Sequence, residues 1–176
     1  MQSTLNALTS NPMGDDHKSW QDGASLLSEQ TLSRRTFRSL VFHFLYALDA
    51  YEYQVPLSAI IANFNEGYDL EISPNGDLAV MVQGVVDQRD RLDELIRPVL
   101  ANWRIDRLGC VTLLILRMGL WELLNTKTPI NIVINEAVEL AKCFAEKDSF
   151  RFVNGILDQL AAQVHLSDGA AESESI

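Results

Sequence analysis

The sequence predicts an all-α fold in a single domain. Apolar residues return at steps of three and four along most of the chain, which is the spacing of one face of a helix. No segment shows the alternation with period two that marks a half-buried strand. The stretch from Ile105 to Leu124 is apolar on nearly all sides, as expected for a helix at the centre of a helical domain. With 176 residues, 47% of them hydrophobic, the chain can bury a sizeable core but is too short for two substantial domains.

The composition divides the chain into three parts. Residues 1–30 are rich in Ser, Asn, Asp, Gln and Gly and lack periodicity, so we expect a flexible polar extension. Residues 31–166 carry the helical patterns and form the expected domain. Residues 167–176 are acidic, and we expect a disordered tail.

The first helix carries an unusual group of cations. Ser33 is a good N-cap, and apolar residues follow at helical spacing up to Leu48. Arg34, Arg35 and Arg38 occupy the first turns, where each cation opposes the helix dipole at a cost of about 0.3–1 kcal/mol. A solvated helix end and an anion-binding surface both explain such a group.

The middle of the chain predicts two helices. The first covers residues 56–64 and is followed by an acidic loop. The second has Ser73 as its cap, Pro74 at its first position and Asp77 as an acid in its first turn, and it ends near Pro98. The alternating charges of residues 89–94 indicate a solvent-facing surface.

The central helix contains one residue that needs a partner. Arg117 interrupts the apolar stretch, and a buried charge must be paired. Glu122 or Glu136 is expected to pair with it.

Two helices meet at a charged corner near the end of the chain. The first runs from Ile130 to Phe144, and the second starts behind Asp148, a suitable cap, and continues to Leu160. Gly155 inside the second helix suggests close helix packing, because glycine there costs about 1 kcal/mol relative to alanine.

Charge and composition limit the classes of function. The net charge of −10 argues against indiscriminate binding to nucleic acid, yet residues 31–48 hold three arginines and no acid. The sequence has no membrane-length apolar run and no secretory signal pattern, which favours a cytoplasmic protein. Cys110 and Cys143 lie in apolar patterns and are expected to be buried free thiols in a reducing compartment.

The sequence predicts a binding protein rather than an enzyme. It lacks the phosphate-binding, dinucleotide-binding and metalloprotease motifs, and its histidines are scattered, so neither a cofactor nor a metal is expected. The candidate surfaces are the arginine-rich helix start and the corner around Asp148, where Ser149 and Arg151 add polar groups at a helix N-terminus. Such surfaces suit single-stranded RNA better than duplex DNA.

Three stretches resemble one protein family. INEAVELAKCFAEKDSFRFVNGILD, the preceding LGCVTLLILRMGLWELL and the earlier SRRTFRSLVFHFLYAL are similar to the bacterial transcription antitermination factors of the NusB family. The resemblance covers about Ser33 to Leu160. It implies about seven helices in two small packed bundles. It also implies binding to the boxA element of nascent ribosomal RNA, in a heterodimer with the small-subunit ribosomal protein NusE, and indirect contact with other Nus factors and RNA polymerase.

The resemblance also implies two sets of site residues, and it allows a homodimer when the chain is alone. The expected RNA-binding residues are Arg34, Arg35, Arg38, Asp148, Ser149 and Arg151, and the expected NusE-binding residues are Tyr46, Thr112, Arg117 and Glu122. Two alternatives stay open: a protein-interaction module of the same fold with little RNA affinity, and a NusB-like domain related to ribosomal RNA cytosine methyltransferases.

Overall fold

The computed structural model describes the backbone of residues 27–100 and 104–173, and the side chains of residues 28–100 and 104–164. These residues contain seven α-helices, which confirms the all-helical prediction. The helices are α2 (Arg34–Ala50), α3 (Leu57–Tyr68), α4 (Asp77–Asp87), α5 (Arg89–Ile96), α6 (Cys110–Asn125), α7 (Ile130–Phe144) and α8 (Ser149–Ser173). Short 3-10 turns are η1 (Glu29–Thr31), η2 (Arg97–Leu100) and η3 (Ile105–Arg107).

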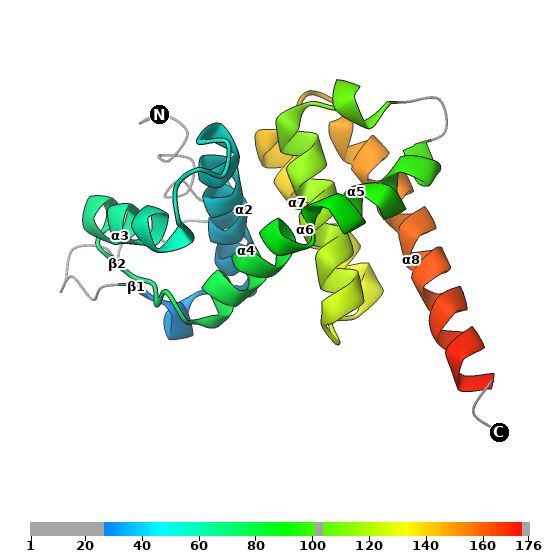
Figure 1. Ribbon diagram of the computed structural model, residues 1–176, viewed down its shortest axis with the longest axis horizontal. Helices are drawn as coiled ribbons and strands as arrows, with labels where there is room; N and C mark the ends of the chain where they lie inside the picture. The colour runs from blue at the N-terminus through cyan, green and yellow to red at the C-terminus, as the bar shows by residue number, and fades with distance from the viewer. Residues whose placement is uncertain (1–26, 101–103, 174–176) are drawn as a thin grey trace, which may run out of the picture.

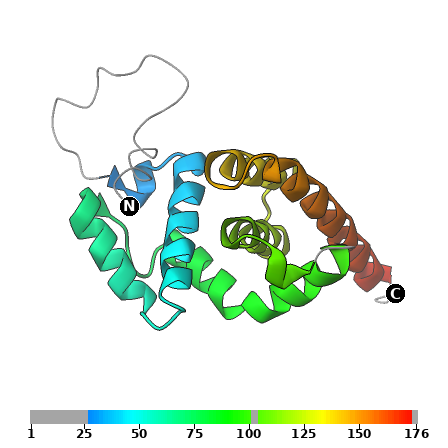
Figure 2. The ribbon, with the colours of Figure 1, turned by 90° about the horizontal axis from the view of Figure 1, so that it is seen from above.

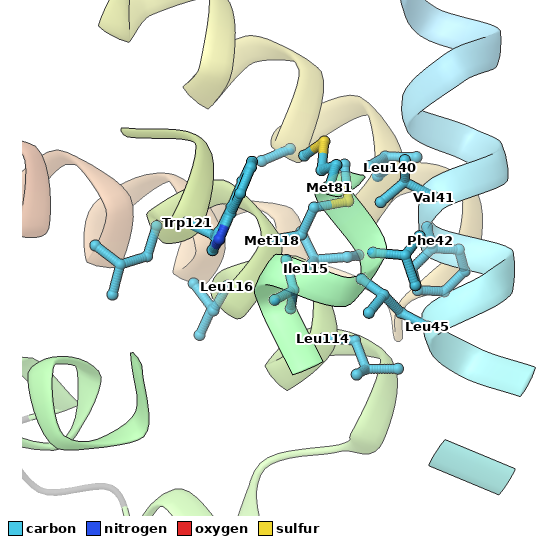
Figure 3. Close-up of a cluster of buried hydrophobic side chains, with 14 of the residues drawn as sticks. Val41, Phe42, Leu45, Met81, Leu114, Ile115, Leu116, Met118, Trp121 and Leu140 are labelled. Carbon is cyan, nitrogen blue, oxygen red and sulfur yellow. The ribbon is translucent and has the colours of Figure 1, made fainter. Parts of the chain in front are cut away.

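The helices form two groups around one continuous core. Helices α2, α3 and α4 make the N-terminal group, and α5 to α8 make the C-terminal group (Figure 1). Helix α6 lies in the middle, and Figure 2 shows it end-on with the other helices around it. Its side chains are buried on nearly every face, as the apolar stretch predicted. Figure 3 shows how Leu114, Ile115 and Met118 of α6 meet Val41 and Leu45 of α2.

The N-terminal group contains a contact that the sequence pattern did not indicate. Strand β1 (Leu27–Ser28) pairs in parallel with β2 (Leu70–Glu71), so two short strands occur where no strand was expected. Glu29 of η1 then accepts a hydrogen bond from the N–H of Leu78 at 2.6 Å, and so caps α4. Residues 1–26 of the predicted extension lie outside the described residues, but residues 27–30 are built into the domain.

Three of the predicted helix boundaries were wrong. The single helix expected from Pro74 to near Pro98 begins only at Asp77, and it breaks at Gln88, where the backbone has φ −97° and ψ 8°. The break turns α5 so that it follows the curve of the core around α6 (Figure 2). The last helix, expected to end at Leu160, continues to Ser173, through much of the segment for which we predicted an acidic tail.

Gly155 does not serve the close helix packing that the sequence suggested. A Cβ atom at this position would meet no atom within 4 Å, whereas at Gly84 it would lie 2.6 Å from the indole ring of Trp121. Glycine therefore permits a close approach at Gly84, between α4 and α6, whereas Gly155 costs helix stability without a packing reason among the described residues.

We expect Gly155→Ala to stabilise the protein. Alanine in an open helix interior gains about 0.5–1 kcal/mol over glycine. Urea unfolding followed by circular dichroism measures the gain. Gly67→Ala in α3 is the matched control, because Gly67 is also helical with open space at its Cβ, and it should give a similar gain. A loss of stability in the Gly155 variant would mean that its backbone packs against another element.

Candidate nucleic-acid interface

The start of α2 presents two arginines to solvent and buries a third. Ser33 caps the helix as expected, since its Oγ accepts the N–H of Thr36 at 3.0 Å. Arg34 and Arg35 are exposed. Arg38, one turn later, has only 6% of its surface exposed. The three arginines therefore do not form one exposed group.

Arg38 is held inside the protein by Glu122 of α6. Its Nε donates to Glu122 Oε2 at 3.0 Å, and its Nη2 donates to Glu122 Oε1. Glu122 is also buried, with 5% of its surface exposed. The structure thus joins a residue expected at the RNA surface to a residue expected at the partner surface, in a two-pronged buried ion pair of the kind that arginine forms with carboxylates.

Arg35 turns toward α7. Its Nη2 lies 3.3 Å from Glu139 Oε2 and its Nε lies 3.9 Å from Glu136 Oε2, while 64% of the side chain stays exposed. Lys142 Nζ lies 2.7 Å from the other oxygen of Glu139. The hydrogen bond from Lys142, together with the charges of Lys142 and Arg35, lowers the pKa of the Glu139 carboxyl. One acid therefore links two exposed cations.

The corner between α7 and α8 continues this row of side chains. Lys142 Nζ lies 5.6 Å from the centre of the half-buried Phe150 ring, and the guanidinium carbon of Arg151 lies 5.6 Å from the same centre. Asp148 is exposed and has a left-handed backbone with φ 70°. Its carbonyl accepts the N–H of Arg151 at 3.1 Å, and Ser149 donates its own N–H to the carbonyl of Glu146 at 3.0 Å.

These contacts make one surface from the two segments that the sequence singled out. We call it the cationic stripe and define it by Arg35, Glu139, Lys142, Phe150 and Arg151. The sequence analysis did not select Lys142 or Phe150. A lysine in the last turn of α7 and an aromatic residue in an otherwise polar corner were the available signals, but only the packing of α7 beside α2 and α8 gives them a common position.

The residues expected to meet the partner protein are mostly buried. Tyr46 has 45% of its surface exposed, whereas Thr112 and Arg117 are buried. Arg117 donates from Nε and Nη2 to the two carboxylate oxygens of Asp93, at 2.7 and 2.8 Å. The expectation that Glu122 or Glu136 pairs with Arg117 was therefore wrong. Asp93, placed by the sequence on a solvent face, turns inward because α5 curves around α6.

A polar network lies next to Arg117 at the end of α2. Asp49 accepts the hydroxyl of Tyr53 at 2.8 Å and the thiol of Cys110 at 3.0 Å. Partial burial and the nearby Asp49 carboxylate raise the pKa of Tyr53 to about 12 and the pKa of Cys110 to about 12. Both groups stay protonated at neutral pH. The hydrogen bond from Cys110 joins the end of α2 to the beginning of α6, and the one from Tyr53 fixes the turn after α2.

The expectation that both cysteines are buried was wrong. Cys110 and Cys143 are exposed free thiols. Cys110 is the first residue of α6, before the helix enters the core, and Cys143 follows Lys142 on the outer side of α7. Apolar sequence neighbours do not bury a residue when the helix turns that position outward.

The described residues contain no group of three or more potential metal ligands, and no helix among them is long and apolar enough to cross a membrane. Polar side chains instead gather on open surfaces at helix ends. Such an open polar surface, on a small all-helical domain, is typical of the class of binding proteins.

Residues 35–162 match the model of the NusB family. The transcription antitermination protein NusB of Staphylococcus carnosus is 38% identical over 130 residues, which cover 73% of this chain and 99% of that protein. The chain belongs to the NusB family of transcription antitermination proteins, a family without enzymatic activity.

Solved structures agree with this assignment. NusB of T. maritima superposes with a TM-score of 0.66 at 31% identity, covering 74% of this chain and 92% of that one. A chain from a complex of the antitermination factors NusB and NusE with double-stranded RNA superposes with a TM-score of 0.62 at 27% identity. The superposition covers 74% of this chain and 96% of that one. The fold of about seven helices in two groups is therefore the NusB fold.

Proposed function

We propose that this chain is an antitermination factor that binds the boxA element of nascent ribosomal RNA as a heterodimer with NusE. It would act in the cytoplasm and reach other Nus factors and RNA polymerase through the assembled complex. The cationic stripe carries the proposal, because it places exposed cations and an aromatic ring along one surface. A structural neighbour that was solved with NusE and RNA supports it.

The side chains of the stripe suit single-stranded RNA. Arg35, Lys142 and Arg151 would contact phosphates, and Phe150 offers a ring on which an unpaired base can stack. Asp148 and Ser149 lie at the same corner and would contact base edges. Arg38 is held by Glu122 and donates from Nη1 to the carbonyl of Arg34 at 3.4 Å, so in this proposal it would support the start of α2 rather than touch RNA.

The charge balance supports the proposed need for a partner. Glu136 and Glu139 neutralise part of the charge of Arg35, and the chain carries a net charge of −10. Phosphate contacts by a few cations give modest, salt-sensitive affinity. NusE would add contacts and raise the affinity of the pair above that of this chain alone.

Tyr46 is the exposed member of the proposed NusE surface. The centre of its ring lies 6.2 Å from the centre of the Phe42 ring, and Phe42 stacks on Phe144 with ring centres 4.9 Å apart. The exposed tyrosine therefore packs against an aromatic side chain that is itself in contact with a second one. Tyrosine is common among the residues that contribute most to protein interfaces. Thr112, Arg117 and Glu122 lie behind the surface and would hold it in shape rather than touch the partner.

The test is a gel shift with boxA RNA, with and without NusE, over a salt series. Arg35→Glu combined with Arg151→Glu should weaken binding at least tenfold, because two phosphate contacts become repulsive. Arg91→Glu combined with Arg97→Glu is the matched control, since both arginines are exposed on the other side of α6 and the charge change is the same. Binding by the stripe variant that equals binding by the control would show that the stripe is not the RNA site.

One observation favours the second candidate, a protein-interaction module with little RNA affinity. The acids paired with Arg35 reduce the positive charge available to RNA. Under that reading the chain would bind NusE with the same affinity whether or not RNA is present. Isothermal titration with NusE in both conditions separates the two functions.

A further inference from the structure

A groove opens beside the start of α2, on the side away from the corner of α7 and α8. It encloses about 600 Å³ between the first turn of α2, the first turns of α4 and the loop from α6 to α7. Phe37, Val80 and Pro129 line its apolar part, and Arg34 and Lys127 stand on its rim. None of these residues belongs to the cationic stripe.

The apolar part of the groove is unusually open to solvent. Val80 has 59% of its surface exposed, the highest value among the exposed large hydrophobic residues in the described part of the chain. Phe37 beside it is half-buried. An exposed aliphatic side chain next to an aromatic ring forms an apolar surface against which a nucleobase can pack.

The rim of the groove favours an anion. Arg34 and Lys127 are exposed, and neither forms an ion pair with another described residue. Asp77 is the one exposed acid that lines the groove, against two exposed cations.

The floor of the groove is electrically balanced. The buried pair of Arg38 and Glu122 lies there, and each of its charges cancels the other. The cations that remain available are therefore those of the rim, next to the apolar wall. An apolar wall beside an anion-binding rim matches the base and phosphate of a nucleotide.

We propose that this groove receives one nucleotide of the bound RNA, with its base against Phe37 and Val80 and its phosphate between Arg34 and Lys127. The inference rests on the proposed RNA-binding function and extends its site. Arg34 is the neighbour of Arg35, which begins the cationic stripe, so the RNA would pass across the start of α2 from the stripe into the groove.

The experiment measures the binding of boxA RNA oligonucleotides that are shortened one nucleotide at a time from either end, in the presence of NusE. Val80→Asp and Lys127→Glu should each weaken binding of the full oligonucleotide about tenfold. Removal of the nucleotide that occupies the groove should weaken binding by the parent protein by a similar factor and leave binding by these variants unchanged. The controls are Leu95→Asp and Arg97→Glu, an exposed apolar residue and an exposed cation on α5 and η2.

Circular dichroism checks the fold of each variant, and we expect all four to be folded because all four positions are exposed. Variants of Val80 and Lys127 that bind every oligonucleotide like the parent, while the stripe variant loses binding, would overturn the groove and leave the proposed function standing. Variants that lose NusE and keep RNA would also overturn it, because the groove would then hold a protein. A parent chain that binds no RNA with NusE present would overturn the proposed function and this inference together.

Discussion

Replacing Glu122 with alanine should lower the free energy of unfolding by about 3–5 kcal/mol, because it leaves the buried guanidinium of Arg38 without its partner. Arg38 and Glu122 have 6% and 5% of their surface exposed, so water cannot replace the lost hydrogen bonds without opening the contact between α2 and α6. Urea unfolding at neutral pH measures the change. Loss of this pair would also loosen Arg34, whose carbonyl accepts a hydrogen bond from Arg38.

Two controls separate the pair from a general effect of mutation. The double variant Arg38→Met with Glu122→Leu should recover most of the stability, because apolar side chains of similar volume often replace a buried ion pair without loss. Glu139→Ala removes the exposed partner of Arg35 and should cost no more than about 1 kcal/mol. If Glu122→Ala unfolded like Glu139→Ala, the buried pair would not hold the two helices together.

Because Arg38 is part of this buried pair, its substitution can reduce RNA binding by unfolding the protein. A charge reversal at Arg34, Arg35 and Arg38 together would lose RNA binding, but part of that loss would come from unfolding. Arg38→Met combined with Glu122→Leu should keep most of the RNA affinity of the parent in the gel shift. A large loss in this stable double variant would mean that Arg38 contacts RNA directly.

Gly84→Ala should destabilise the protein by about 1–3 kcal/mol, the usual cost of overpacking a core. A Cβ atom at this position would lie 2.6 Å from Cζ2 and Nε1 of Trp121, closer than any relaxed contact. The indole has 9% of its surface exposed and sits among the core side chains of α6 in Figure 3, so it has little room to move. Differential scanning calorimetry measures the shift in melting temperature.

A second substitution tests the cause of this loss. Trp121→Phe removes the part of the ring that meets the new methyl group, so Gly84→Ala should cost less in that background than in the parent. The buried Nε1 of Trp121 has no hydrogen-bond partner among the described residues, so its removal carries no loss of a hydrogen bond there. Equal costs in the two backgrounds would mean that α4 and α6 do not approach each other this closely.

The sequence by itself determined the helical class, the central position of α6 and the cap of α2. Each of these follows from local spacing: an all-round apolar stretch must be buried, and Ser33 before a periodic run accepts the N–H of Thr36. The family followed from three long matching stretches, and residues 35–162 confirm it. These features depend on residues close together in the chain, and for that reason a pattern can reveal them.

The tertiary structure alone decided which of the charged residues face solvent. Arg34, Arg35 and Arg38 look alike in the sequence, but α6 brings Glu122 against Arg38 and turns it into a core residue. Arg117 pairs with Asp93 because α4 and α5 break apart at Gln88, and local spacing does not fix the direction of that turn.

The cationic stripe and the groove have the same origin. Lys142 and Phe150 join Arg35 on one surface only because α7 lies beside α2 and turns back into α8. Lys127 and Val80 border one groove only because the loop after α6 returns to the start of α4. Such positions depend on contacts between residues far apart in the chain. The burial of apolar area decides which helices pack together, and local helix propensity does not say which residue a side chain will contact.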